Sequence, residues 1–165
     1  MRGRVELRPM TIDDVALLRT WDDDADVAAA IGGRGADWYD WPVELARDVR
    51  WRELLIATED GRPIGFIQLF DAGEEETHYW GDVAPGTWSL DIWIGSPDDR
   101  GRGLGREVMH AALRRIFDHH GAEVVLIDPR IENRRAISFY ERLGFERVED
   151  RELDGDRCLV MSHRR

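Results

Sequence analysis

Three glycines placed directly before a helix constrain the fold of this chain more than any other feature. They are Gly101, Gly103 and Gly105, in the stretch DDRGRGLGREV at 98–108. A strand pattern, TWSLDIWIG at 87–95, comes before them, and the amphipathic pattern REVMHAALRRIFDHH at 106–120 follows. A helix start leaves backbone N–H groups without partners and carries positive potential. Glycines there let a phosphate approach closely, so the stretch predicts a pyrophosphate cradle.

Arginines flank the glycines and can add positive charge: Arg100, Arg102 and Arg106. The alternative is a flexible turn followed by a helix cap. The spacing does not match the P-loop pattern, which needs a lysine that this chain lacks. It also does not match the dinucleotide fingerprint, because G-x-G-x-G lacks the third spacing.

The order of the remaining patterns predicts the fold class. Expected strands lie at 4–10, 51–60, 64–70, 87–95, 122–129, 145–153 and 157–164. Expected helices begin at Thr11, at Pro42 (to about 49), at 106 and at 132, the last ending at Gly144. The stretch 71–86 reads as a long acidic loop containing aromatic residues. Hairpins interrupted by two helical crossovers favour an α+β fold, with a mixed, mostly antiparallel central sheet flanked by helices. At 165 residues without a linker, we expect one domain, 1–165.

The charge distribution bears on the partners of the protein. The formal net charge is −11, and residues 1–95 carry all of it, with 9 arginines against 20 acidic residues. Such a field repels nucleic acid and attracts cations, but the charge taken alone favours a solvated acidic surface that aids solubility. Without an 18-residue apolar run or an apolar leader pattern, we expect no membrane span and no signal peptide. The lone Cys158 suits a cytoplasmic protein and reads as a buried small residue.

The glycine motif resembles the acetyl-CoA motif of the GNAT superfamily of N-acetyltransferases when the segment NRRAISFYERLGF at 133–145 is read with it. The LRPM segment of the first strand fits the same superfamily. The resemblance implies a GNAT fold, acetyl-CoA as co-substrate and no metal. It implies that backbone groups of Ile92, Trp93 and Ile94 bind the pantetheine arm, and that Tyr140 points at the sulfur. The full set expected to bind acetyl-CoA is Ile92, Trp93, Ile94, Arg100, Gly101, Arg102, Gly103, Leu104, Gly105, Arg106, Asn133, Ala136 and Tyr140.

Transfer of an acetyl group to an amine needs a base, an oxyanion donor and a proton for the leaving thiolate. Asp91 is the candidate base, because a carboxylate within the apolar strand WSLDIWI is costly unless it is used or paired. A salt bridge with an arginine is the alternative reading. Tyr140 is the candidate acid, with packing in the core as the alternative.

A narrower resemblance concerns the aminoglycoside 6'-N-acetyltransferases. It lies in PIGFIQ, the acidic and aromatic loop, the LD of the following strand, DPRIENRRAISFYERLGF and the late DG. It implies Asp91 as base and an aminoglycoside as a small cationic substrate. The residues expected to line the substrate site are Gln68, Tyr79, Trp80, Asp91, Asp128 and Asp154. The acidic run Glu74–Glu76 would steer cations toward the site.

Alternatives remain open on this scaffold. They are another small-amine acetyltransferase acting on a polyamine or siderophore precursor, a protein N-acetyltransferase, and a non-catalytic acyl-CoA-binding module. Either a monomer or a homodimer is compatible with the sequence. The segment Trp38–Trp41 has no counterpart in the resemblance, and its role is open.

Overall fold

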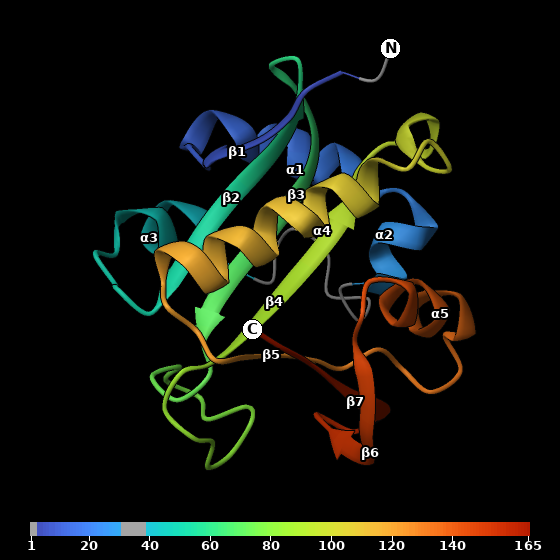
Figure 1. The fold of residues 1–165 in the computed structure, drawn as a ribbon. Coiled ribbons are helices and arrows are strands. Elements are labelled where there is room, and N and C mark those ends of the chain that lie inside the picture. Colours follow the sequence, from blue (N-terminus) through green and yellow to red (C-terminus); the bar gives the residue numbers. More distant parts are fainter. Residues whose placement is uncertain (1–2, 31–38) are drawn as a thin grey trace. The chain divides into compact units, whose positions relative to one another are not determined.

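A computed structural model describes residues 3–30 and 39–165 of the chain. The strands are β1 Val5–Pro9, β2 Arg52–Glu59, β3 Arg62–Asp71, β4 Thr87–Ile94, β5 Val124–Ile127, β6 Glu146–Leu153 and β7 Asp156–Arg164. The helices are α1 Val15–Asp22, α2 Ala25–Ala30, α3 Trp41–Ala46, α4 Leu104–Arg114 and α5 Arg134–Arg142. The strands are hydrogen-bonded in the order β1-β2-β3-β4-β5-β7-β6 (Figure 1), which confirms the predicted α+β fold with a mixed sheet.

The contacts divide the chain into two units, which we describe separately. The first unit contains the described residues of 1–69 and 91–113. The second contains residues 70–90 and 114–165. The expectation of one domain over 1–165 remains a prediction.

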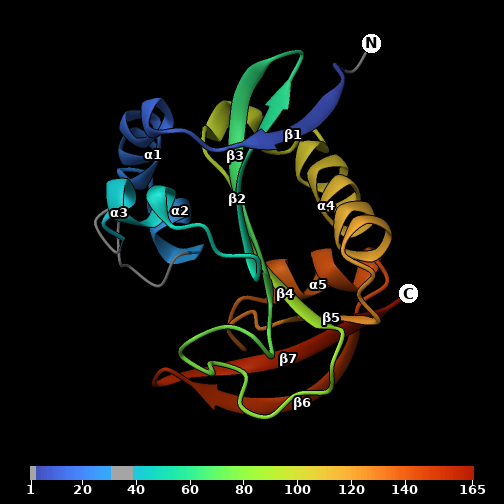
Figure 2. The same ribbon diagram turned by 90° about the vertical axis from the view of Figure 1, so that its left-hand side faces the viewer.

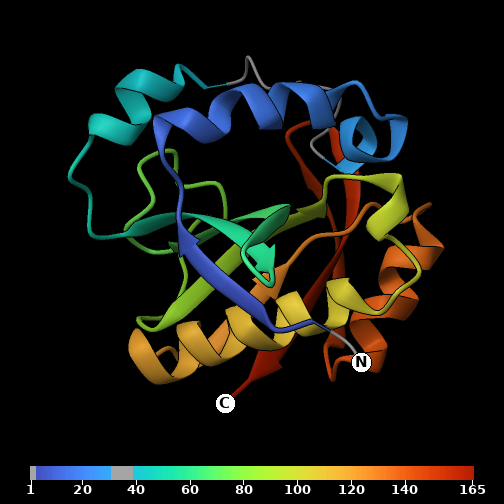
Figure 3. The same ribbon diagram turned by 90° about the horizontal axis from the view of Figure 1, so that it is seen from above.

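In the first unit, helices cover both faces of the strands β1–β3. Figures 2 and 3 show α1 and α3 on one face and α4 on the other. The entry to α1 is fixed by a capping box, in which the Asp14 carboxylate accepts a bond of 2.8 Å from the Thr11 backbone N–H. Arg8 on β1 then donates two bonds to Asp14, at 2.8 and 2.7 Å. The strand and the helix that follows it are therefore tied by one buried carboxylate.

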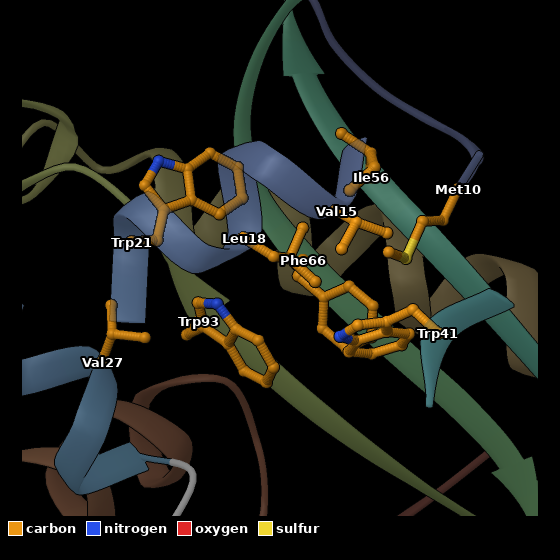
Figure 4. Close-up of a cluster of buried hydrophobic side chains, with 9 residues drawn as sticks. All are labelled: Met10, Val15, Leu18, Trp21, Val27, Trp41, Ile56, Phe66 and Trp93. Atoms are coloured by element: carbon orange, nitrogen blue, oxygen red, sulfur yellow. The ribbon is translucent and has the colours of Figure 1, made fainter. Parts of the chain in front are cut away.

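The apolar core of this face lies between the first helices and the strands (Figure 4). Trp41 and Phe66 contact edge to face, with ring centroids 5.8 Å apart, and Phe66 lies 4.6 Å from Trp93. The short helix α3 begins at Trp41, which is 1% exposed, and Pro42 lies in its first turn, where a proline is well tolerated. The indole anchors the helix, whose length alone would not make it stable.

In the second unit, the first half of β4 pairs in parallel with β5, and β5 pairs antiparallel with β7. β6 and β7 form a hairpin with a register shift between Arg147 and Glu149. The helix α5 connects β5 to β6 and ends at Arg142; Gly144, two residues further on, has a φ of 94°, the left-handed conformation that commonly follows a helix C-terminus.

The structure corrects several expected boundaries. The helix α2 at Ala25–Ala30 was not predicted, because a short alanine-rich segment after three acidic residues has no apolar stripe. The helix expected at 106–120 begins earlier, at Leu104, and its last turn, Arg115–His119, is a π-helix. Trp38, part of the unexplained segment Trp38–Trp41, lies outside the described residues. Within the described ranges, no helix is both long and apolar enough to cross a membrane.

Candidate active site

The glycine loop leads into α4 with the geometry that a diphosphate needs. Gly101 and Gly103 have φ of 72° and 81°, a conformation in which a side chain is strained. A Cβ at Gly101 would meet nothing within 4 Å, so the loop borders open space. The backbone N–H groups of the first turn of α4, at Leu104, Gly105 and Arg106, have no earlier helical turn to donate to. The predicted cradle therefore fits the group it is meant to hold.

The Arg100 side chain holds the loop itself. Its guanidinium pairs with Asp24 at 2.7 Å and donates to the backbone oxygens of Ile94 and Gly95, each at 3.1 Å. The bond from Arg100 lowers the pKa of Asp24. Arg100 thus joins the end of β4, the loop and the turn before α2.

The Arg102 side chain is also engaged by carboxylates. It donates to Glu59 at 3.1 Å and to Asp99 at 3.0 Å. Arg62 binds the same Asp99 through two bonds, at 2.9 and 2.8 Å. Asp99 is only 4% exposed, and the Arg62 bonds lower the pKa of this carboxyl. The charges of Arg100 and Arg102 are therefore already compensated, whereas the Arg106 side chain is exposed.

Asp91 lies next to Gln68 across neighbouring strands of the first unit. The Gln68 amide nitrogen donates a bond of 3.0 Å to the Asp91 carboxylate. Gln68 is 5% exposed, and its amide oxygen is buried with no hydrogen-bond donor from the described part of the chain. The predicted strand alternation accounts for Trp93, which points into the core from the same face of β4 as Asp91. Ile92 and Ile94 are half-buried on the opposite face.

Three further predicted substrate residues form a cluster in the second unit. The Tyr79 hydroxyl donates to the Asp128 carboxylate. Burial raises the pKa of Asp128 to about 6, against the lowering effect of the Tyr79 bond, and Asp154 adds to the rise. Asp154 lies in the β6–β7 turn with φ of 49°. Burial and the Asp128 charge raise the pKa of Tyr79, so the Tyr79 hydroxyl keeps the proton that it donates to Asp128.

Trp80 completes the aromatic part of this cluster. It contacts Tyr79 edge to face at 5.5 Å and is 3% exposed. Its indole N–H is buried without an acceptor among the residues that the structure describes. A buried donor without a partner costs free energy, so an acceptor supplied by a ligand would be favourable here.

The predicted residues on α5 are placed by a helix cap and by aromatic contacts. The Asn133 side chain accepts a bond of 3.1 Å from the Ala136 backbone N–H and begins the helix. Tyr140 is half-buried between Phe139 and Phe145, with centroid distances of 5.4 and 5.6 Å. Its ring therefore packs against its neighbours, and the role of its hydroxyl as the acid remains a prediction.

The sequence did not indicate two further residues of the first unit, Tyr39 and Arg52. Tyr39 is hydrogen-bonded to Gln68 and lies near Asp91, and the Arg52 guanidinium lies 5.5 Å from the Tyr39 ring centroid. Neither belongs to a motif, so no sequence signal could have found them. Sequence reasoning assigned Glu75 to cation steering, but its carboxylate accepts bonds from the backbone of Thr77 and Tyr79 and thereby shapes the acidic loop.

No group of three or more metal-ligating side chains occurs within the residues that the structure describes. Comparisons with known sequences and structures identify the protein family. Residues 11–153 match the sequence profile of the acetyltransferase (GNAT) domain family. The chain therefore belongs to the GNAT acetyltransferases, and it is an acetyl-CoA-dependent N-acetyltransferase with acetyl-CoA as co-substrate.

Several similar proteins within this family are aminoglycoside acetyltransferases. The aminoglycoside N(6')-acetyltransferase type 1 of Klebsiella pneumoniae is 30% identical over 149 residues, covering 87% of this chain and 74% of that protein. The aminoglycoside acetyltransferase AAC(6')-Ib in complex with coenzyme A aligns with a TM-score of 0.85 and 28% identity, covering 98% of this chain and 95% of that one. Its complex with ribostamycin and coenzyme A gives the same TM-score and identity, with 98% and 93% covered.

Proposed function

We propose that this protein is an aminoglycoside 6'-N-acetyltransferase that confers antibiotic resistance. The observation that carries the proposal is the Gln68–Asp91 pair. The Asp91 carboxylate and the buried amide oxygen of Gln68, which accepts no hydrogen bond from the described residues, are adjacent acceptors. An ammonium group offers several hydrogen-bond donors, and a sugar amine offers neighbouring hydroxyl donors as well. The relatives named above, which act on aminoglycosides, support this substrate class.

The proposed chemistry assigns one proton transfer to each of two side chains. Asp91 takes a proton from the substrate ammonium, directly or through one water, and leaves a neutral amine. The amine nitrogen forms a bond to the acetyl carbon as the carbon–sulfur bond breaks, and Tyr140 donates its proton to the leaving sulfur. The acylated nitrogen then loses its second proton, which restores the Tyr140 hydroxyl directly or through one water; the proton held by Asp91 passes to solvent. Backbone groups of Ile92–Ile94 orient the thioester, and a backbone N–H stabilises the negative charge on the acetyl oxygen.

Acetyl-CoA supplies the activated acetyl group when it is bound. In the proposal, backbone N–H groups of the loop Gly101–Arg106 hold its diphosphate, and Asn133 and Ala136 lie along its pantetheine and adenine side. The Arg100 and Arg102 side chains contribute by fixing the loop, since their charges are paired with carboxylates. Asp128 and Asp154 bind substrate amines, with Tyr79 and Trp80 beside them.

Thiol release from acetyl-CoA tests the proposal. We expect turnover with kanamycin and little with spermidine or a basic peptide. Asp91→Asn should reduce kcat by ~10²-fold or more, because a general base contributes about that much. Asp150→Asn, in an exposed ion pair with Arg157, is the matched control and should keep full activity.

Other outcomes would point elsewhere. Turnover with spermidine alone would make the protein a polyamine acetyltransferase. Binding of coenzyme A without turnover on any amine would make it a non-catalytic module. Wild-type turnover by Asp91→Asn would move the base to another residue.

A further inference from the structure

Tyr39 begins a chain of polar contacts that ends at the proposed base. Hydrogen bonds from Arg52 and Gln68 reach its hydroxyl, and Asp91 is close enough to act on it electrostatically. Gln68 in turn donates its bond of 3.0 Å to Asp91. Because burial raises the pKa of Tyr39, its hydroxyl stays protonated at neutral pH. The order of contacts is thus Arg52, Tyr39, Gln68, Asp91.

Arg52 holds one end of this series of polar contacts in a fixed position. Its side chain is 4% exposed, and its guanidinium pairs with Glu44 of α3 at 2.5 Å. It also lies over the rings of Tyr39 and Trp51, at 5.5 and 5.1 Å from their centroids. A buried guanidinium held by a carboxylate and two rings has few orientations available.

A series of aromatic ring contacts also starts at Tyr39. Tyr39 contacts Trp41 edge to face at 5.2 Å, and Trp41 leads through Phe66 to Trp93. Figure 4 shows Trp41, Phe66 and Trp93 as one continuous group of rings. Trp93 lies two residues from Asp91 on β4, so the polar contacts and the ring contacts both connect the segment before α3 to the same part of that strand.

We propose that Tyr39, held by Arg52, is a positioning residue of the acetyltransferase that fixes the Gln68 amide against Asp91. The inference rests on the proposed function, because it assumes that Asp91 is the base. It also gives a role to the part of Trp38–Trp41 that the structure describes.

The physical reason is the freedom of the glutamine side chain. Gln68 has three rotatable bonds, and its amide oxygen is buried without a donor. With only the Asp91 bond, the amide could turn and leave the carboxylate misaligned. The contact with Tyr39 removes that freedom. Small misplacements of catalytic groups cost rate rather than binding, so the signature is a fall in kcat.

Tyr39→Phe is the direct test, because it removes the hydroxyl and keeps the ring packing. We expect kcat with kanamycin to fall roughly 10-fold, while KM for acetyl-CoA stays the same. Thr20→Val is the matched control, since it removes an exposed hydroxyl of α1 that donates to the Ala16 oxygen at 3.1 Å. The control should keep the wild-type kcat.

A double-variant cycle separates positioning from a general structural effect. In the Asp91→Asn background, Tyr39→Phe should change kcat by less than about 2-fold, because there is no base left to position. Arg52→Lys should reproduce the kcat loss of Tyr39→Phe, since it keeps the charge and loses the planar contact. Circular dichroism and thermal melting of each variant verify folding.

The results distinguish two failures. If Asp91→Asn keeps wild-type turnover, the proposed base is wrong and this inference falls with it. If Asp91→Asn is impaired but Tyr39→Phe is active as wild type, or the two effects multiply in the double variant, only the positioning role is overturned.

Discussion

Individual residues show how two carboxylates of the proposed site differ in their hydrogen-bond partners. Asp91 and Asp128 are both half-buried; Asp91 accepts a bond from the Gln68 amide and Asp128 one from the Tyr79 hydroxyl, and desolvation raises the pKa of Asp128 to about 6. Asp128 will therefore change charge close to neutral pH. A carboxylate that loses its charge no longer attracts an ammonium group.

We expect KM for kanamycin to rise as the pH falls through about 6, because Asp128 becomes protonated there. In Asp128→Asn, KM should be high and should not change over this pH range. Steady-state kinetics from pH 5 to 8 measure both. A parallel rise in the variant would assign the titration to another group.

Tyr79→Phe provides a second, signed prediction. The Tyr79 hydroxyl donates to Asp128 and stabilises its charged form, so the variant should raise the pKa of Asp128 further. The rise in KM for kanamycin should then begin at higher pH than in the wild type. A shift to lower pH would contradict the role assigned to this bond.

The residues of the site differ in how far the sequence could predict them. The alternation of β4 placed Asp91 correctly beside Trp93, because the side-chain period of a strand is two. The motif around 98–108 placed Gly101 and Gly103 before α4, whereas Gly105 lies in the first turn of that helix, which begins at Leu104. Tyr39 and Arg52 could not be predicted, since the contacts of Tyr39 with Arg52 and Gln68 depend on how distant segments pack.

Among the elements, the glycine loop that is the proposed diphosphate site is held by ion pairs of Arg100 and Arg102. Glu59 at the end of β2 and Asp99 before the loop are 8% and 4% exposed, and both bind Arg102. The loop and the β2–β3 hairpin therefore share one buried set of charges. Removing a carboxylate would leave guanidinium donors unsatisfied.

Asp99→Asn should lower the free energy of unfolding by about 1–3 kcal/mol and raise KM for acetyl-CoA. Because Arg62 lowers the pKa of Asp99, its charge stabilises the wild type above pH 3.8 and that contribution is lost as the pH falls further. Urea unfolding at pH 7 and pH 3.5 should show a smaller difference between variant and wild type at the lower pH. Asp150→Asn, in an exposed pair, should change stability very little.

Patterns in the sequence predicted most elements but not their ends. The capping signal at Thr11 correctly marked a helix start, although the first turn, Ile12–Asp14, is a 3-10 turn. The amphipathic stripe correctly marked α4, but not the π-helix at Arg115–His119. Helix ends depend on tertiary contacts that periodicity does not contain.

For the whole molecule, the net charge of −11 has a kinetic consequence. If the acidic excess attracts a polycationic substrate, kcat/KM for kanamycin should fall several-fold between ~20 and ~300 mM salt. An amino sugar with a single charge should show a weaker dependence. Equal slopes for the two substrates would show that the acidic surface serves solubility alone.

The close contact between Gly95 and Trp21 limits how this protein can evolve. A Cβ at position 95 would lie 2.0–2.4 Å from atoms of the indole ring, which is closer than atoms can approach. A relative with a side chain after this strand must therefore carry a smaller residue where Trp21 stands. We expect the two positions to vary as a pair across the family, with the change at position 21 coming before any side chain at position 95.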